Sequence, residues 1–177
     1  MMGILILVII LIVAILIMYN SLVKARLKVK QAESGIDVYL KQRFDLIPNL
    51  VETVRGYSKH EQTIFTEIAE LRSSYMKQPE NIKNAENLNN KMNQLMAVAE
   101  SYPDLKASEQ YLNLQKTLSK LESQLQAARR IYNSEVTEYN QKIETIPSNL
   151  IASLFGFERA ELFQIEEYER GNISVKL

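Results

Sequence analysis

His60 and Glu61 open the stretch of the chain that comes nearest to a known metal motif. Zinc proteases carry His-Glu-x-x-His on one helix, so that both imidazoles reach the same ion. Ile64 stands where the second histidine belongs, and His60 is the only histidine of the chain. One imidazole also cannot supply the two Glu-x-x-His pairs of a di-iron bundle. The sequence therefore predicts no metal site here, and we expect His60 to support a turn between two helices.

A proline within a helical stretch, residues 40–51, marks a second candidate site. Pro48 has no N–H and frees a backbone carbonyl about four residues earlier. Arg43, Asp45 and Asn49 surround that gap. These polar groups either repair the kink, by satisfying the freed carbonyl or pairing with one another, or form a recess that receives a partner. We favour repair, because buried polar groups must be paired and such pairing is usually architectural.

A repeated tyrosine-asparagine pair is the third candidate. Tyr132-Asn133 and Tyr139-Asn140 are seven residues apart, so both pairs face the same side of a helix. Arg129 lies one helical turn before Asn133. Buried amides can set the register of a helical bundle. We expect these residues to act in register, with docking of a partner as the alternative.

The composition excludes several classes of function. The 177 residues contain 21 Lys and Arg and 21 Asp and Glu, so the net charge is zero and no nucleic-acid partner is expected. The chain has no cysteine, and its five glycines are isolated, so a thiol nucleophile, Cys-ligated zinc and a Gly-rich phosphate loop are excluded. A Ser-His-Asp triad stays open, but nothing places a serine on a strained turn. We expect no catalytic residue, cofactor, metal or small-molecule substrate.

Residues 1–19 form an apolar run that carries no charged side chain. As a helix it spans roughly 28 Å, just enough to cross a bilayer. A cleaved signal peptide is the alternative, but it would have a basic start and a small-residue cleavage site. The sequence predicts a retained transmembrane anchor over residues 1–19, which binds the lipid bilayer.

Four cations follow the anchor before the first acid, at Lys24, Arg26, Lys28 and Lys30. This basic collar favours a cytoplasmic location for the following domain, with the N-terminus outside the inner membrane. It serves as a stop-transfer signal, which we favour, or as a binding site for anionic headgroups.

Apolar residues beyond the anchor recur at spacings of three and four, so the expected fold class is all-α. We expect an elongated antiparallel four-helix bundle over residues 20–170, with two long and two short helices, and a flexible tail over 171–177. The first long helix covers about 20–56, with a break near Pro48. A capping box at Ser58 and Glu61 starts the second, to about 77. Pro79 opens the third and Pro103 the fourth, which ends at Pro147. A short helix near 150–155 and an amphipathic stretch near 158–168 follow.

The lengths of these helices place the C-terminal apolar residues near the membrane. Only the two long helices reach back to the bilayer, so the short helix lies beside them. Its side chains either pack onto the long helices, which we favour, or enter the bilayer interface. The residues are Leu150, Ile151, Leu154, Phe155 and Phe157.

Two blocks of the sequence resemble the bacterial LemA family. The first comprises YNSLV at 19–23, GIDV at 35–38, LKQRFDLIPNLVETV at 40–54, Gly56-Tyr57 and His60-Glu61. The second comprises Arg129, Tyr132-Asn133, Tyr139-Asn140, Pro147-Ser148-Asn149 and Ile151-Ala152. Glu33 departs from the tryptophan found in many members. The resemblance implies a single-pass membrane protein with its N-terminus outside and a helical bundle inside, with no established enzymatic activity or cofactor. A family member related to magnetosome biogenesis suggests work in membrane organisation.

We therefore expect a non-enzymatic, membrane-anchored scaffold that binds other proteins, in envelope stress, signalling or membrane organisation. The alternatives are a bilayer-binding or membrane-shaping protein, or a non-catalytic subunit of a membrane enzyme complex. A further hypothesis is an enzyme with a carboxylate-based site, which predicts clustered acids with shifted pKa values in a pocket.

Overall fold

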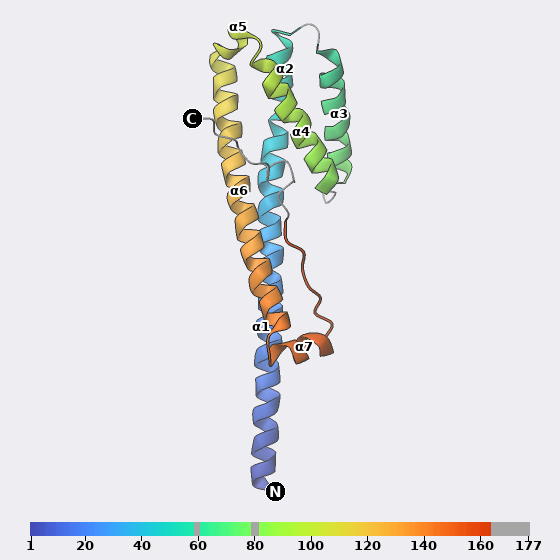
Figure 1. Cartoon of the computed structure of the whole chain (residues 1–177), viewed down its shortest axis with the longest axis vertical. Coiled ribbons are helices and arrows are strands. Elements are labelled where there is room, and N and C mark those ends of the chain that lie inside the picture. The colour runs from blue at the N-terminus through green and yellow to red at the C-terminus, as the bar shows by residue number, and fades with distance from the viewer. Residues whose placement is uncertain (59–60, 79–81, 164–177) are drawn as a thin grey trace, which may run out of the picture. The chain divides into compact units, whose positions relative to one another are not determined.

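The computed structural model describes residues 1–58, 61–78 and 82–163, and every regular element in these ranges is an α-helix, which confirms the expected all-α class (Figure 1). The helices are α1 (Met2–Asp45), α2 (Ile47–Arg55), α3 (Gln62–Lys77), α4 (Ile82–Ala99), α5 (Pro103–Lys106), α6 (Glu109–Glu144) and α7 (Ser148–Leu154). The chain divides into two compact units. The first contains residues 1–34 and the described residues from 128 onward, and the second contains residues 35–127.

The anchor and the first part of the soluble domain form one continuous helix, α1. Its most apolar window of 18 residues has a mean hydropathy of 3.3, and none of it is buried against the rest of the protein. By length and composition this is a helix that can cross a membrane. Its apolar side chains therefore need a cover that the protein does not supply.

The break at Pro48 occurs as expected. α1 ends at Asp45, and α2 begins at Ile47 with the proline in its first turn. A proline is tolerated there because first-turn N–H groups have no partner within the helix. The Leu50 N–H resumes the helical pattern by donating to the Leu46 carbonyl oxygen (3.0 Å). The expected helix over 20–56 is thus divided between two elements.

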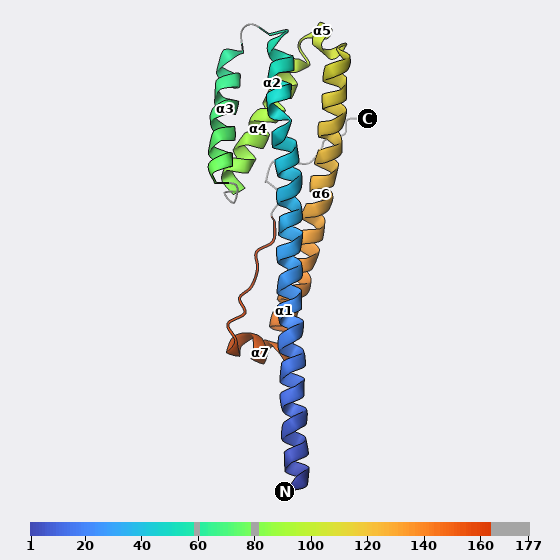
Figure 2. The same cartoon turned by 180° about the vertical axis from the view of Figure 1, so that it is seen from behind.

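The second unit contains a helical hairpin of α3 and α4, which run antiparallel, and α4 also contacts α2 (Figure 2). Its core includes the fully buried Leu50, Ile68, Leu88 and Leu95. The regular four-helix arrangement stays a prediction. Pro79 and His60 lie outside the described residues.

Two of the expected helix starts are wrong. Ser58 does not cap α3, which begins at Gln62, because the Ser58 N–H bonds to the Val54 carbonyl oxygen (3.0 Å) at the end of α2. Pro103 opens only the four-residue α5. The Ser108 hydroxyl then accepts a hydrogen bond from the Tyr111 N–H (3.5 Å), as a serine does at a helix start, and the long helix α6 begins there.

The first unit contains the beginning of α1, the end of α6, and α7. Leu22, Ala25 and Val29 of α1 belong to the same apolar core as Val136 and Tyr139 of α6. α7 adds Ile151 and Ala152 to this core, and Phe157 follows from the next segment. Gly156 adopts a φ of 67°, a conformation that glycine allows at low cost, and it ends the turn after α7. Residues 157–163 have no regular secondary structure. The expected stretch near 158–168 is therefore not helical in its described part, and the predicted tail at 171–177 lies outside the described residues.

Candidate functional site

The repeated tyrosine-asparagine pairs of α6 hold the segment that follows α7. We call Tyr132, Asn133, Tyr139 and Asn140 the amide-tyrosine clamp. The Asn140 Nδ2 donates to the Ala160 carbonyl oxygen (2.8 Å), and the Ala160 N–H donates back to the Asn140 Oδ1 (2.9 Å).

Asn133 repeats this arrangement two helical turns earlier. Its Nδ2 donates to the Phe163 carbonyl oxygen (3.0 Å), and its Oδ1 accepts from the Phe163 N–H (2.8 Å). Each asparagine therefore offers the donor and the acceptor that a neighbouring β-strand would offer.

The two tyrosines add hydrogen bonds to the same backbone. The Tyr139 hydroxyl donates to the Glu158 carbonyl oxygen (2.9 Å), and the Tyr132 hydroxyl donates to the Glu161 carbonyl oxygen (3.0 Å). Burial raises the pKa of both phenols above the usual tyrosine value; at Tyr139 the charge of Arg26 opposes this effect and that of Glu158 adds to it. Both hydroxyls thus keep the proton that they donate at neutral pH.

The spacing of the clamp matches the spacing of the segment. Seven residues of α-helix rise about 10.5 Å, at about 1.5 Å each. Three residues of extended chain rise about 10 Å, at about 3.3 Å each. The step from Asn133 to Asn140 therefore matches the step from Ala160 to Phe163. All six atoms to which the clamp side chains bond are backbone atoms, so the clamp recognises an extended chain and not particular side chains.

Arg129 extends the clamp by one helical turn. Its guanidinium lies over the Phe163 ring, 4.6 Å from the ring centre. This is a cation–π contact, which adds a side-chain interaction to the backbone bonds. We expected Arg129 and the two amides to set the register between helices. Their hydrogen bonds and ring contact instead go to residues 158–163, which are not helical. Periodicity revealed the shared face but not the segment that it binds.

The polar side chains around Pro48 interact with different partners. Arg43, which is buried, forms an ion pair with Glu122 of α6 and donates to the Asn93 Oδ1 of α4 (3.1 Å). Asp45 is exposed and pairs with Lys41 one turn earlier (3.2 Å). Asp45 therefore pairs within its own helix and not, as expected, with the other polar residues around Pro48. Arg43 connects α1, on which it lies, to α4 and α6.

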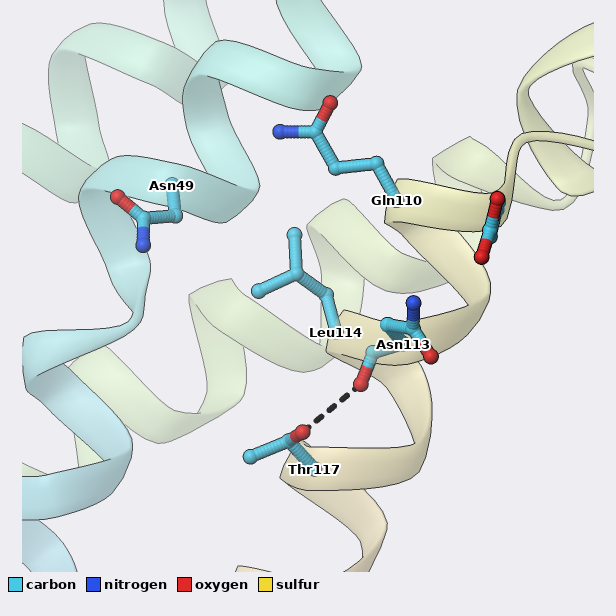
Figure 3. Close-up of a pocket in the computed structure, with 6 residues that line it drawn as sticks. Asn49, Gln110, Asn113, Leu114 and Thr117 are labelled. Carbon is cyan, nitrogen blue, oxygen red and sulfur yellow. Dashed lines mark hydrogen bonds between the residues drawn. The ribbon is translucent and has the colours of Figure 1, made fainter.

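Asn49 lines a shallow hollow of about 490 Å³ beside the first turns of α6 (Figure 3). The other lining residues are Glu109, Gln110, Asn113, Leu114 and Thr117. The Thr117 hydroxyl donates to the Asn113 carbonyl oxygen (2.8 Å), which is the dashed line in Figure 3. Three of the six lining residues, Asn49, Gln110 and Asn113, carry amides that can offer hydrogen bonds to a partner.

Acidic side chains of the described residues do not gather into a metal site: no three His, Cys, Asp or Glu lie close enough to hold one ion. Burial raises the pKa of Asp37, whereas the pKa of Glu138 is lowered by a hydrogen bond and charge from Lys142 and by the charge of Lys28. These two carboxylates belong to different units. These two described acids with shifted pKa values therefore do not form the cluster in one pocket that the carboxylate-enzyme hypothesis predicts.

The basic collar is exposed, and two of its members have partners in the first unit. Lys28 lies 3.8 Å from Glu135 and 3.7 Å from Glu138, and the Arg26 guanidinium lies 5.1 Å from the centre of the Phe157 ring. Lys24 and Lys30 are also exposed.

The expected membrane-proximal residues divide into two sets. Ile151 and Phe157 are buried in the core of the first unit. Leu150, Leu154 and Phe155 are exposed by 67 %, 74 % and 51 %. Packing onto the long helices therefore accounts for the first set only.

Comparison with known proteins identifies the chain's relatives. Protein LemA of Metamycoplasma hominis is 27 % identical over 158 residues, which cover 87 % of this chain and 72 % of the relative. Magnetosome protein MamQ 2 of Paramagnetospirillum magneticum is 26 % identical over 182 residues, covering 86 % of this chain and 67 % of the relative. Magnetosome protein MamQ of Magnetospirillum gryphiswaldense is 23 % identical over 181 residues, covering 86 % and 66 %.

The family and the apolar helix together define a membrane-anchored protein. The model of the LemA family matches residues 32–177, which is most of the chain and includes the Pro48 region and the clamp. The span precedes this match, in the uncovered window of α1. The resemblance carried by the two sequence blocks is thereby confirmed, and the chain belongs to the LemA family.

Proposed function

We propose that this protein is a non-enzymatic, membrane-anchored scaffold that presents helical surfaces to other proteins. The observation that supports it most is the clamp. Asn133 and Asn140, which lie seven residues apart on one face of α6, each donate to and accept from the backbone of residues 160 and 163. Groups that are satisfied in this way hold architecture in place and are not free to act on a substrate.

The scaffold needs surfaces that remain available to partners. Leu112 and Ile131 on α6 are apolar and exposed by 50 % and 57 %. Exposed aliphatic side chains on a rigid helix are suitable anchors for a protein partner. Envelope stress, signalling and membrane organisation are the processes in which such a scaffold would act, and two of the relatives are named as magnetosome proteins.

Photo-crosslinking in cells tests the scaffold. A photoreactive phenylalanine analogue is placed at Leu112 or Ile131, and at the exposed Lys120 as a polar control. We expect discrete protein adducts from one or both apolar positions, which mass spectrometry identifies, and fewer from Lys120. The absence of any protein adduct at both apolar positions would overturn the proposal.

We propose further that the N-terminus lies outside the inner membrane and that the helical domain is cytoplasmic. The four cations of the collar follow the span directly, and an excess of Lys and Arg beside a span marks its cytoplasmic side. Since the chain has no cysteine, a Ser119→Cys variant carries a single thiol at an exposed position of α6. We expect a membrane-impermeant maleimide to label it only after lysis, whereas labelling of intact cells would require the opposite orientation.

A second candidate function is binding or shaping of the bilayer. The exposed apolar residues of α7 favour it over the remaining alternative, a non-catalytic subunit of a membrane enzyme complex. No described feature supports that alternative separately. The two candidates are compatible, because one surface can dock to lipid while another binds protein.

A further inference from the structure

We propose that α7 and the residues on either side of it lie in the interface of the bilayer, with the face of Leu150 and Leu154 against lipid. The surface also includes Ile146 and Phe155, and we call these four residues the α7 apolar face. This goes beyond the scaffold proposal and rests on the second candidate function, bilayer binding, to which it assigns a surface outside the transmembrane span.

The α7 apolar face is highly exposed. Ile146 is exposed by 83 %, Leu150 by 67 %, Leu154 by 74 % and Phe155 by 51 %. Residues 145–157 contain no charged side chain. Soluble proteins rarely expose large contiguous apolar patches, and such patches usually mark a site of interaction.

The opposite side of α7 is already occupied. Ile151 and Ala152 are buried in the core of the first unit, and they keep only 7 % and 1 % of their surface exposed. A surface helix normally turns one apolar side inward and a polar side outward. α7 is apolar on both sides, so its outer side requires a second apolar environment.

A ring contact sets the depth of α7 relative to the span. The Phe155 ring centre lies 4.8 Å from that of Tyr19, and the Phe157 ring centre lies 5.8 Å from it. A hydrocarbon core of about 30 Å takes about 20 helical residues. The uninterrupted apolar run of the span ends at Met18, next to Tyr19, so the rings that touch Tyr19 lie at the edge of the bilayer.

The basic collar agrees with this depth. Lys24 lies five residues beyond Tyr19, which is about 7.5 Å along the helix axis. The headgroup layer on each side of the hydrocarbon is about 5–7 Å thick. The first cation therefore reaches the outer boundary of the headgroups, whereas Phe155 lies at their inner boundary. Arg26, whose guanidinium contacts the Phe157 ring, can extend toward the phosphates.

Two hydroxyls in the turn before α7 and at its start, those of Thr145 and Ser148, need no water as a partner. The Ser148 hydroxyl donates to the Lys142 carbonyl oxygen (2.6 Å) or the Thr145 carbonyl oxygen (3.0 Å). The Thr145 hydroxyl donates to the Gln141 carbonyl oxygen (2.9 Å). Placing this turn in the interface therefore leaves these donors satisfied, which lowers the cost of removing them from water.

A bilayer fits this surface better than a soluble protein does. The apolar face is continuous with the span through the contact of Phe155 with Tyr19. Any occupant must therefore reach the edge of the hydrocarbon, where lipid is already present. A second copy of the chain or another protein at this edge is distinguished by the experiment below.

Tryptophan fluorescence tests the proposal, because the chain contains no tryptophan. The full-length Leu154→Trp variant is reconstituted into phosphatidylcholine vesicles, with and without lipids brominated on the acyl chains. Leu112→Trp is the matched control, since Leu112 is also an exposed leucine of a helix. We expect blue-shifted emission from Leu154→Trp and several-fold stronger quenching by brominated lipid than in Leu112→Trp. Acrylamide should quench the two variants in the reverse order.

Two outcomes overturn the proposal. Emission of Leu154→Trp that resembles that of Leu112→Trp would place α7 in water. Blue-shifted emission that brominated lipid does not quench would mean that protein covers the face, and dilution of the protein into excess lipid would then shift the emission to the red. Phe155→Trp serves as a second probe in case the first substitution disturbs α7. Neither result depends on the protein partners that test the scaffold.

Discussion

Asn140 and Ala160 exchange two hydrogen bonds, of 2.8 Å and 2.9 Å, through the side-chain amide of one and the backbone of the other. The side chain thereby takes the place of a neighbouring β-strand for one residue of an extended segment. Asn133 and Phe163 repeat the arrangement. A helix thus holds a non-helical segment by backbone recognition.

Replacing Asn140 with alanine should release the middle of the bound segment. The variant loses one donor and one acceptor, each worth about 1 kcal/mol, so local opening should increase by roughly ten- to a hundred-fold. Hydrogen exchange of the Ala160 amide, which donates to Asn140, measures the change directly.

Thr137→Ala is the matched control for this variant. Thr137 lies on the same helix, and its hydroxyl bonds only to the Asn133 carbonyl oxygen (2.8 Å) among the described residues. Its exchange pattern at Ala160 should match that of the wild type. Equal protection of Ala160 in Asn140→Ala and in the wild type would contradict the clamp.

Removing the Tyr139 hydroxyl should cost more than removing the Tyr132 hydroxyl. Tyr139 is 3 % exposed, whereas Tyr132 is only partly buried. Tyr139→Phe therefore leaves the Glu158 carbonyl oxygen without its donor in a part-buried contact and should destabilise the protein by about 1 kcal/mol. Water can replace the Tyr132 hydroxyl, so Tyr132→Phe should change the free energy of unfolding by less. Denaturant unfolding of the full chain in detergent compares the two, and an equal or reversed order would argue against burial as the cause.

Local sequence patterns predicted the helices well because helical periodicity is a local property. The break at Pro48 followed from the backbone restrictions that a proline imposes. The predicted start of α3 was wrong because the Ser58 N–H bonds at the end of α2. The capping pattern describes one helix and does not show which of two neighbouring helices a residue joins.

The bound segment could not be predicted in the same way. The seven-residue spacing of Tyr132-Asn133 and Tyr139-Asn140 predicts a shared helix face. Their partners, however, lie between 19 and 30 residues away in the sequence. Those partners are backbone groups, which carry no sequence signal of their own. The match between seven helical residues and three extended residues is visible only when both segments are known.

The ion pair between Arg43 and Glu122 should stabilise the second unit. Arg43 is buried, so Glu122→Ala leaves its guanidinium with one charged partner fewer and should lower the free energy of unfolding by about 2 kcal/mol. Asp45→Ala removes the exposed pair with Lys41 and should cost less than about 0.5 kcal/mol. Thermal unfolding of both variants measures the difference. Similar losses in the two would show that burial does not strengthen the Arg43 pair.

The charge of Glu138 should make part of the stability of the first unit dependent on pH. Lys142, which donates a hydrogen bond to Glu138 (2.9 Å), holds the pKa of that carboxyl below its usual value, and Lys28 adds to the effect. Because the pKa is lower in the folded state, this contribution is present above the usual glutamate pKa. It is lost as the pH falls through the lowered value.

Lys142→Met should therefore raise the Glu138 pKa more than Lys28→Met does, since Lys142 supplies both a hydrogen bond and a charge. An NMR titration of the Glu138 carboxyl carbon in each variant measures both shifts. The stability difference between wild type and Lys142→Met should shrink on acidification. A difference that grows instead would reverse the assigned sign.

Asn49 should be tolerant of substitution as far as folding is concerned. Its side chain is exposed and lines the hollow beside α6, while its backbone oxygen accepts the Thr53 hydroxyl (2.7 Å) whatever the side chain is. Asn49→Ala should therefore change the free energy of unfolding by less than about 0.5 kcal/mol, as surface substitutions usually do. Thermal unfolding beside Glu122→Ala, the buried-pair variant, checks this. A loss comparable to that of Glu122→Ala would restore Asn49 to the repair of the Pro48 kink, whereas an unchanged melting temperature leaves docking at the hollow as the role that its amide can serve.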